Sequence, residues 1–380
     1  MIASTSRPYI IGACVALTLI LFLSLQTRQE SSTASSKWLD YSDKAPISPE
    51  HRNYLSATSG TRLRPADTTS EIGRASNSTL GFERVFVIGL PDRSDKRDAM
   101  VLSASLTGFH VEFVDGLLGE HVSDRARPPG LDLKDGALGS WRGHMNTIRR
   151  IIENNLASAF IMEDDVDWDI RLLNQLPEYA RGIRTLSHIP LEQRQHSPYG
   201  DDWDILWPGH CGDVLPSTLT KDPSAPPKDD LYIIKEDETV APKSAQTWLK
   251  ALADYPENTR IVHKAGAPIC AFGYGVSYRG AQKILMALAV KGGMNLAVDN
   301  ALALLCRDGY LDMKCYSVEP QLFQHHRSAG AKNRDSDINS LGDADAEGTR
   351  ERGVTDMIVW SARLNLEHMI VGRQDYFAQW

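Results

Sequence analysis

The sequence predicts an α/β fold with a mostly parallel, twisted sheet, because short apolar runs alternate with segments of helical spacing. Apolar runs at residues 85–90, 111–116 and 157–162 are typical of strands that are buried on both faces. A polar turn after residue 90 leads into an expected helix, and residues 141–154 have the period of a second helix. Strands and helices in this order are the signature of an α/β domain.

The second half of the domain continues the alternation with shorter and less regular segments. Residues 212–259 are rich in proline and charge, and we interpret most of that stretch as a surface insertion. The expected elements are strands at 202–207, 231–234 and 316–320, a strand or loop at 269–276, and helices at 279–290 and 297–306.

A run of carboxylates directly follows the third apolar run: Glu163, Asp164, Asp165 and Asp167. Such a cluster is stable mainly when a hard divalent cation lies among the oxygens, since the charges otherwise repel one another. A solvated turn is the ordinary alternative for an acidic run. Ligands bind at the outer ends of strands in open α/β sheets, and this position favours a metal-bridged diphosphate site.

The composition excludes some functions and bounds the number of domains. A chain of 380 residues can form one large or two ordinary domains. Its net charge of −8 and the absence of interleaved basic and aromatic residues argue against nucleic acid as a partner.

Residues 9–25 are uncharged and almost wholly apolar, which predicts one transmembrane helix of minimal length. Arg7 lies before this segment, so we expect a cytoplasmic tail over 1–8 and a lumenal body in the ER or Golgi membrane, as a single-pass type II protein. A cleaved signal peptide is the alternative. We expect a flexible stem over 26–80, a catalytic domain over 81–338 and a C-terminal extension over 339–380, which could hold a terminal helix.

Four cysteines fall in the expected lumenal body: Cys211, Cys270, Cys306 and Cys315. Three pairings are open to them, and free buried thiols with one bridge compete with two bridges. Asn77 begins an N-glycosylation tripeptide, which fits the same compartment.

Eight segments occur in an order that together carries a family resemblance: 86–97, 136–144, 163–166, 202–209, 278–285, 298–299, 319–324 and 336–338. In this shared order they resemble glycosyltransferase family 25, which includes lipooligosaccharide and collagen galactosyltransferases. The resemblance covers residues 84–338. Gly89 and Gly143 depart from it, because the family usually has Asn and Ser there.

The resemblance implies a GT-A-like domain that transfers a sugar to a hydroxyl of a glycan or glycoprotein. We expect galactose from UDP-galactose, Mn²⁺ or Mg²⁺ as cofactor, and inversion. Alternate residues of a strand share a face, so Asp165 and Asp167 are the expected metal ligands. Glu163 and Asp164 would then hold the donor ribose or a metal-bound water. His325 or His326 could complete the metal shell, although a surface His pair is the more usual explanation.

The other expected site residues each have an ordinary alternative. Asp299 is the expected general base, or else a helix cap. Arg93 and Arg97 could meet the donor phosphate or be exposed helix charges. His144 could hydrogen-bond the donor or pack beneath it.

Two other functions compete with the transferase. An inactive family relative could act as a lumenal adhesion or scaffold protein, although the intact acidic run argues against this. A metal-dependent hydrolase would need His ligands grouped with the acids, and none lies near residue 163 in the sequence.

Overall fold

The computed structural model describes residues 67–219, 229–246, 252–338 and 348–380. The predicted tail and membrane anchor over residues 1–25 lie outside these ranges. Within the described ranges, no helix has both the length and the apolar character needed to cross a bilayer.

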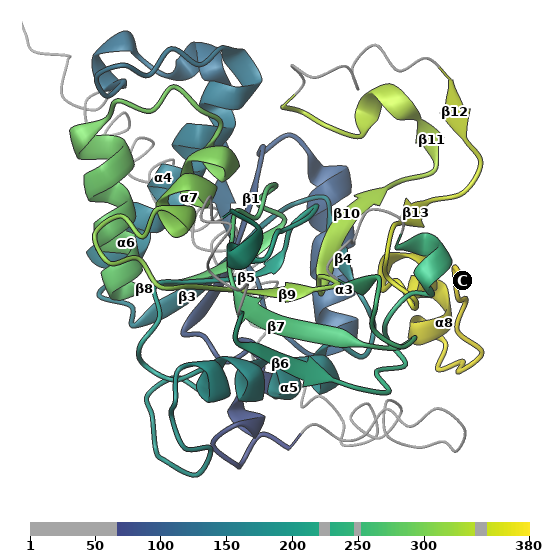
Figure 1. Ribbon diagram of the computed structural model, residues 1–380. Helices are drawn as coiled ribbons and strands as arrows, with labels where there is room; N and C mark the ends of the chain where they lie inside the picture. Colours follow the sequence, from purple (N-terminus) through teal and green to yellow (C-terminus); the bar gives the residue numbers. More distant parts are fainter. Residues whose placement is uncertain (1–66, 220–228, 247–251, 339–347) are drawn as a thin grey trace, which may run out of the picture. The chain divides into compact units, whose positions relative to one another are not determined.

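A largely parallel sheet forms the centre of the described fold, as the sequence predicts (Figure 1). Along its main path, β8 and β7 run against the other strands. The order is β2 (Glu112–Asp115), β1 (Arg84–Gly89), β3 (Ser158–Glu163), β8 (Gly273–Ser277), β5 (Ile205–Gly209), β9 (Cys315–Glu319), β7 (Arg260–Lys264) and β6 (Leu231–Ile234).

Helices cover both faces of this sheet, which explains why its central strands read as continuous apolar runs. Phe86 and Ile88 of β1 pack in one core cluster with residues of α4, α6 and α7. Val85 and Val87 point the other way and pack in a second cluster with residues of α3 and α5. The helices are α3 (Ser94–Thr107), α4 (Asp135–Glu153), α5 (Leu172–Leu186), α6 (Tyr278–Ile284), which continues as a π-helix to Lys291, α7 (Val298–Arg307) and α8 (Leu366–Ile370).

A second set of strands, which the sequence does not predict, extends the sheet beside β5. It contains β10 (Phe323–Arg327), β4 (Val166–Trp168) and β13 (Val354–Thr355). β10 is antiparallel to both β4 and β13. The sequence of β10 contains two histidines, an arginine and a glutamine, so it lacks the apolar signal of a strand.

Both expected boundaries of the folded domain differ from the structure. Ile72, Ala75 and Leu80 are buried in the core, so the chain is already folded within the stretch that we expected to be a stem. At the other end, β13 joins the sheet through β10, and the helical spacing after residue 358 produces only the short α8. The folded unit therefore includes residues 72–80 and 348–370.

Two disulfides are formed, which settles the open pairing. Cys211 bonds Cys270, and Cys306 bonds Cys315. The first bridge joins the segment after β5 to the loop before β8, at the edge of the sheet where β1 and β3 also end.

Candidate functional site

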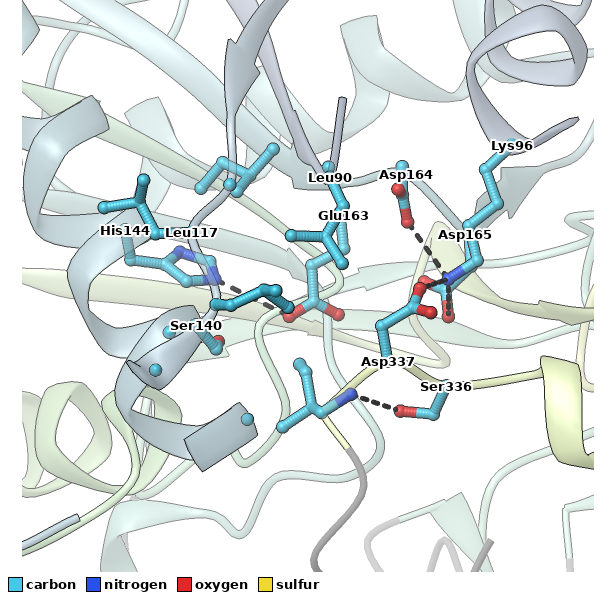
Figure 2. A pocket seen from close by; sticks show the side chains of 18 of the residues that line it. Leu90, Lys96, Leu117, Ser140, His144, Glu163, Asp164, Asp165, Ser336 and Asp337 are labelled. Atoms are coloured by element: carbon cyan, nitrogen blue, oxygen red, sulfur yellow. Dashed lines mark hydrogen bonds and ion pairs between the residues drawn. The ribbon is translucent and has the colours of Figure 1, made fainter. Parts of the chain in front are cut away.

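A cavity of about 410 Å³ lies at the carboxyl ends of β1 and β3 (Figure 2). The loop after β2 and the first turns of α4 form its other walls. Four apolar residues line the cavity, Ile88, Leu90, Leu117 and Leu118, together with the acidic turn after β3 and two further acids, Glu120 and Asp135. A lining that mixes apolar and charged side chains suits a ligand that has both characters.

Glycines bring backbone segments close together around this cavity. A Cβ atom on Gly89 would lie 2.3 Å from Oδ2 of Asp164, so a side chain at residue 89 would displace this carboxyl group. A Cβ atom on Gly139 would lie 2.1 Å from the carbonyl oxygen of Leu117. Gly89 is one of the two departures from the resemblance noted above, and Asp164 occupies the space that a side chain at residue 89 would need.

The acidic turn receives a histidine from a distant part of the chain. β10 pairs with β4 so that His325 lies opposite Val166. Nε2 of His325 is 3.0 Å from Oε2 of Glu163 and 3.5 Å from Oδ1 of Asp165. Glu163, Asp165 and His325 each offer one ligand atom, and these atoms lie within 4.8 Å of one another.

This trio fits a divalent cation by its chemistry as well as its spacing. Two carboxylates and an imidazole are a ligand set that Mn²⁺ accepts. Oδ1 of Asp165 is buried and has no hydrogen-bond partner among the described residues. A buried carboxylate oxygen without a partner is costly, and a bound cation would satisfy it.

Two histidines keep Glu163 ionised. Nε2 of His144 lies 3.5 Å from Oε1 of Glu163, and its Nδ1 lies 2.8 Å from the hydroxyl of Tyr274. Burial raises the pKa of Glu163, but hydrogen bonds to His144 and His325 outweigh burial and hold it well below its usual range. His144 is 1% exposed and lines the cavity, so it packs beneath the site and also contacts an acid.

Lys96, on α3, lies beside the acidic turn (Figure 2). Its Nζ lies 3.3 Å from Oδ1 of Asp164, 4.0 Å from Oδ2 of Asp165 and 2.7 Å from Oδ2 of Asp337. Burial raises the pKa of Asp164 to about 7, and the charge of Asp165 adds to this, although Lys96 opposes it. Lys96 lines the cavity and is 9% exposed.

The structure does not bring Asp167, an expected metal ligand, into the trio. Its carboxylate is fully buried and accepts hydrogen bonds from Thr355, Ser361 and the backbone N–H groups of Trp168 and Arg363. Residues 164 and 165 form a turn between β3 and β4, so the strand alternation that would place Asp165 and Asp167 on one face is interrupted. His326 also lies outside the trio: its Nδ1 is 2.8 Å from the hydroxyl of Thr355, the same hydroxyl that donates to Asp167.

The two expected donor-binding arginines lie outside the lining of this cavity. Arg97 donates to the carbonyl groups of Gly89 and Leu90 and to the carboxylate of Asp115, so it holds the ends of β1 and β2 together. Arg93 pairs with Asp95 and with Asp337. Asp337 does line the cavity, so Arg93 reaches the site only through it.

Asp299 lines a second cavity, of about 250 Å³, which adjoins the first. Glu163, His325 and Ser140 line both cavities. Asp299 is the second residue of α7, after the N-cap Ala297, so it is not the capping residue itself. Its Oδ2 accepts a hydrogen bond of 2.9 Å from the backbone N–H of Cys270, which fixes the carboxylate at the cavity wall.

Sequence reasoning missed Lys96 and Asp337 and did not separate His325 from His326. Lys96 lies in the sequence between Arg93 and Arg97, the two arginines that were expected to bind the donor. The pairing of β10 with β4 decides which histidine faces Glu163, and it joins segments more than 150 residues apart. Only Ser336 to Ile338, a motif without an assigned role, gave a signal near Asp337.

No family model matches the chain, but curated proteins do. Procollagen galactosyltransferase 1 of Danio rerio is 23% identical over 69% of this chain and 39% of its own length. Procollagen galactosyltransferase 1-A of Xenopus laevis is 28% identical over 34% of this chain and 21% of its own length.

A bovine relative carries a different name: the probable inactive glycosyltransferase 25 family member 3 of Bos taurus is 29% identical over 35% of this chain and 22% of its own length. In all three, the matched part is less than half of the relative. These matches confirm that the chain resembles glycosyltransferase family 25, as its motifs predict.

Proposed function

We propose that this chain is a metal-dependent glycosyltransferase that moves a sugar from a nucleotide donor to a hydroxyl of a glycan or glycoprotein. One observation carries the proposal: Glu163, Asp165 and His325 converge in the wall of a cavity whose lining also contains several apolar side chains. The named galactosyltransferases among the relatives support galactose as the sugar and UDP-galactose as the donor.

The donor would lie along the 410 Å³ cavity, with its nucleoside against Leu117 and Leu118 and its diphosphate beside the acidic turn. Glu163, Asp165 and His325 would hold Mn²⁺ or Mg²⁺. A cation bound there would neutralise the charge that develops on the departing diphosphate. His144 holds one oxygen of Glu163 from below, which orients this carboxylate before a ligand arrives.

The acceptor would enter the 250 Å³ cavity, where Asp299 would act as general base. The two cavities share the wall formed by Glu163 and His325, so a sugar at that wall is accessible from both sides. Asp299 would take the proton of the acceptor hydroxyl on the face away from the leaving group, as an inverting transfer requires. Its hydrogen bond from Cys270 leaves the position of the carboxylate well defined.

The proposed location is the lumen of the ER or Golgi, behind an uncleaved anchor at residues 9–25. The apolar character of that segment supports the anchor. The disulfides Cys211–Cys270 and Cys306–Cys315 support an oxidising compartment.

The fold favours keeping the hydrolase as a second candidate. Such an enzyme needs histidines grouped with carboxylates, and the structure places both His144 and His325 beside Glu163. A transferase and a hydrolase differ in whether the sugar reaches an acceptor or water. The inactive relative is the third candidate, and the name of the bovine protein is a reason to test for it.

One assay separates the three candidates. Full-length protein would be incubated with a panel of nucleotide sugars, with Mn²⁺, Mg²⁺ or EDTA, and with and without glycan and glycopeptide acceptors. A transferase releases nucleoside diphosphate faster when an acceptor is present and gives a glycosylated product. Release that no acceptor accelerates, with free sugar as the only product, indicates a hydrolase.

Asp165→Asn tests whether the release comes from this site, and Asp98→Asn, an exposed acid on α3, is its matched control. Asp165→Asn should lower the rate by orders of magnitude, while Asp98→Asn should not change it. No release from any donor at high protein concentration would contradict the proposal and favour an inactive relative.

A further inference from the structure

Lys96, Arg93 and Asp337 lie together at the donor cavity, and the role that we infer for them rests on the proposed function. Lys96 and Arg93 both contact the carboxylate of Asp337. Asp337 lies in the segment after β10, outside the sheet, and its side chain is 30% exposed. Lys96 and Arg93 belong to a different part of the chain, the start of α3.

Two cations that converge on one anion beside a cavity form a seat that also suits a phosphate. Lys96 is in the first turn of α3, where backbone N–H groups add positive potential. Arg93 is the residue before that helix, and its guanidinium binds the oxygens of Asp337 directly. Arginine and lysine in this arrangement bind carboxylate and phosphate oxygens by the same hydrogen bonds.

The position of Lys96 connects this seat to the proposed metal ligands. Its Nζ is 2.7 Å from Oδ2 of Asp337 and 4.0 Å from Oδ2 of Asp165, so Lys96 lies between the segment that carries Asp337 and the acidic turn. A phosphate bound by Asp165 through a cation would lie within reach of the same lysine. Lys96 and Arg93 would then face two anions, the phosphate and the carboxylate of Asp337, where they have room to bind one.

We propose that Lys96 and Arg93 bind a phosphate of the donor, and that the carboxylate of Asp337 occupies this seat in the donor-free protein. The diphosphate and Asp337 therefore compete. Binding of the donor releases Asp337 and the residues beside it, Ser336 and Ile338, which line both cavities. The occupant is thus a nucleoside diphosphate, and the contact is self-inhibitory.

The proposal predicts opposite effects for the two ends of one ion pair. Pyrophosphate and UDP would be titrated by calorimetry into the full chain at one fixed Mn²⁺ concentration. Lys96→Met should weaken binding about tenfold or more, the effect of losing a charge-assisted hydrogen bond. Asp337→Asn should tighten binding by a similar factor, since it removes the competitor. Lys96→Arg should retain most of the affinity.

Asp95→Asn is the matched control. Asp95, like Asp337, pairs with Arg93, but its side chain is 64% exposed and does not line the cavity. Its removal should leave the affinity unchanged. Equal tightening by Asp95→Asn and Asp337→Asn would show a general effect of charge and overturn the proposal.

Other outcomes of these titrations also support or overturn the proposal. A merely structural ion pair would make Lys96→Met and Asp337→Asn change affinity in the same direction or leave it unchanged, and either result overturns the proposal. Asp337 is partly exposed, so Asp337→Asn remains informative even if Lys96→Met fails to fold. Opposite effects on pyrophosphate, without turnover of any nucleotide sugar, would support the seat while contradicting the proposed function.

Discussion

The same substitution, made two residues apart in the acidic turn, should have very different effects on stability. Asp167 is fully buried and accepts four hydrogen bonds, two at each oxygen. In Asp167→Asn, the remaining oxygen can still accept from the N–H groups of Trp168 and Arg363. The amide nitrogen then faces the hydroxyls of Thr355 and Ser361, which must rotate to accept instead of donate. Hydrogen bonds to a charged group contribute about 1.5–3 kcal/mol each.

Loss or weakening of two such bonds should cost about 2–5 kcal/mol of the free energy of unfolding. Asp165→Asn should cost much less in the metal-free protein. Oδ1 of Asp165 has no hydrogen-bond partner among the described residues, and repulsion from Asp164 offsets the attraction of Lys96 and Arg327, which lie 4.0 Å and 3.6 Å from Oδ2.

Urea denaturation followed by circular dichroism measures both differences, with EDTA present so that no cation contributes. The midpoint should fall for Asp167→Asn and change much less for Asp165→Asn. A Thr355→Val variant should reproduce part of the loss at residue 167, because it removes one donor. Equal stability of Asp167→Asn and the parent would refute the network as the reason that Asp167 lies outside the metal trio.

Three further predictions follow from the site and its supports. Asp299→Asn should lower the transfer rate about 10²–10⁴-fold while UDP binding by calorimetry is retained, and activity within a few-fold of the parent would remove Asp299 as the base. Replacing both Cys211 and Cys270 by Ala opens a loop of 59 residues, which should cost about 4 kcal/mol in urea denaturation. The same variant should slow transfer more than it weakens UDP binding, since the backbone of Cys270 holds Asp299. Burial lowers the pKa of His210 from 6.5 to about 4, so between these values only the unfolded chain takes up the proton. The free energy of unfolding therefore keeps the full contribution of His210 above pH 6.5 and loses about 3 kcal/mol as the pH falls to 4. His210→Gln should lack this pH dependence, which denaturation at several pH values would measure.

The sequence predicts the first half of the fold well because β1 and β3 are buried on both faces. Their residues must be apolar whichever helix covers them, so the signal is local. The position of Glu163 to Asp165 at the edge of the sheet follows from the strand that precedes them. Lys96 escapes notice because its partner Asp337 is 241 residues away, and no local pattern connects them.

The histidines and Asp167 show where local patterns fail. Alternation along a strand applies only while the strand continues, and the turn at residues 164–165 interrupts it. Which histidine of β10 faces the acids depends on its register against β4, since His325 lies opposite Val166. Register between distant segments is a property of the whole fold.

The C-terminal segment had no expected role, yet it supports the acidic turn from behind. The side chain of Arg363 donates to the carbonyl groups of Asp164 and Val166. Thr355 and Ser361 of the same segment donate to Asp167. These residues are polar and widely spaced, so only the folded chain reveals that they converge.

The most direct test of the central claim is a crystal structure of the protein with Mn²⁺ and a nucleoside diphosphate, with the metal located by its anomalous scattering. We expect the manganese peak among Glu163, Asp165 and His325. The diphosphate should lie next to it, and the nucleoside should lie against Leu117 and Leu118. A manganese peak elsewhere, or a nucleotide outside the 410 Å³ cavity, would contradict the account.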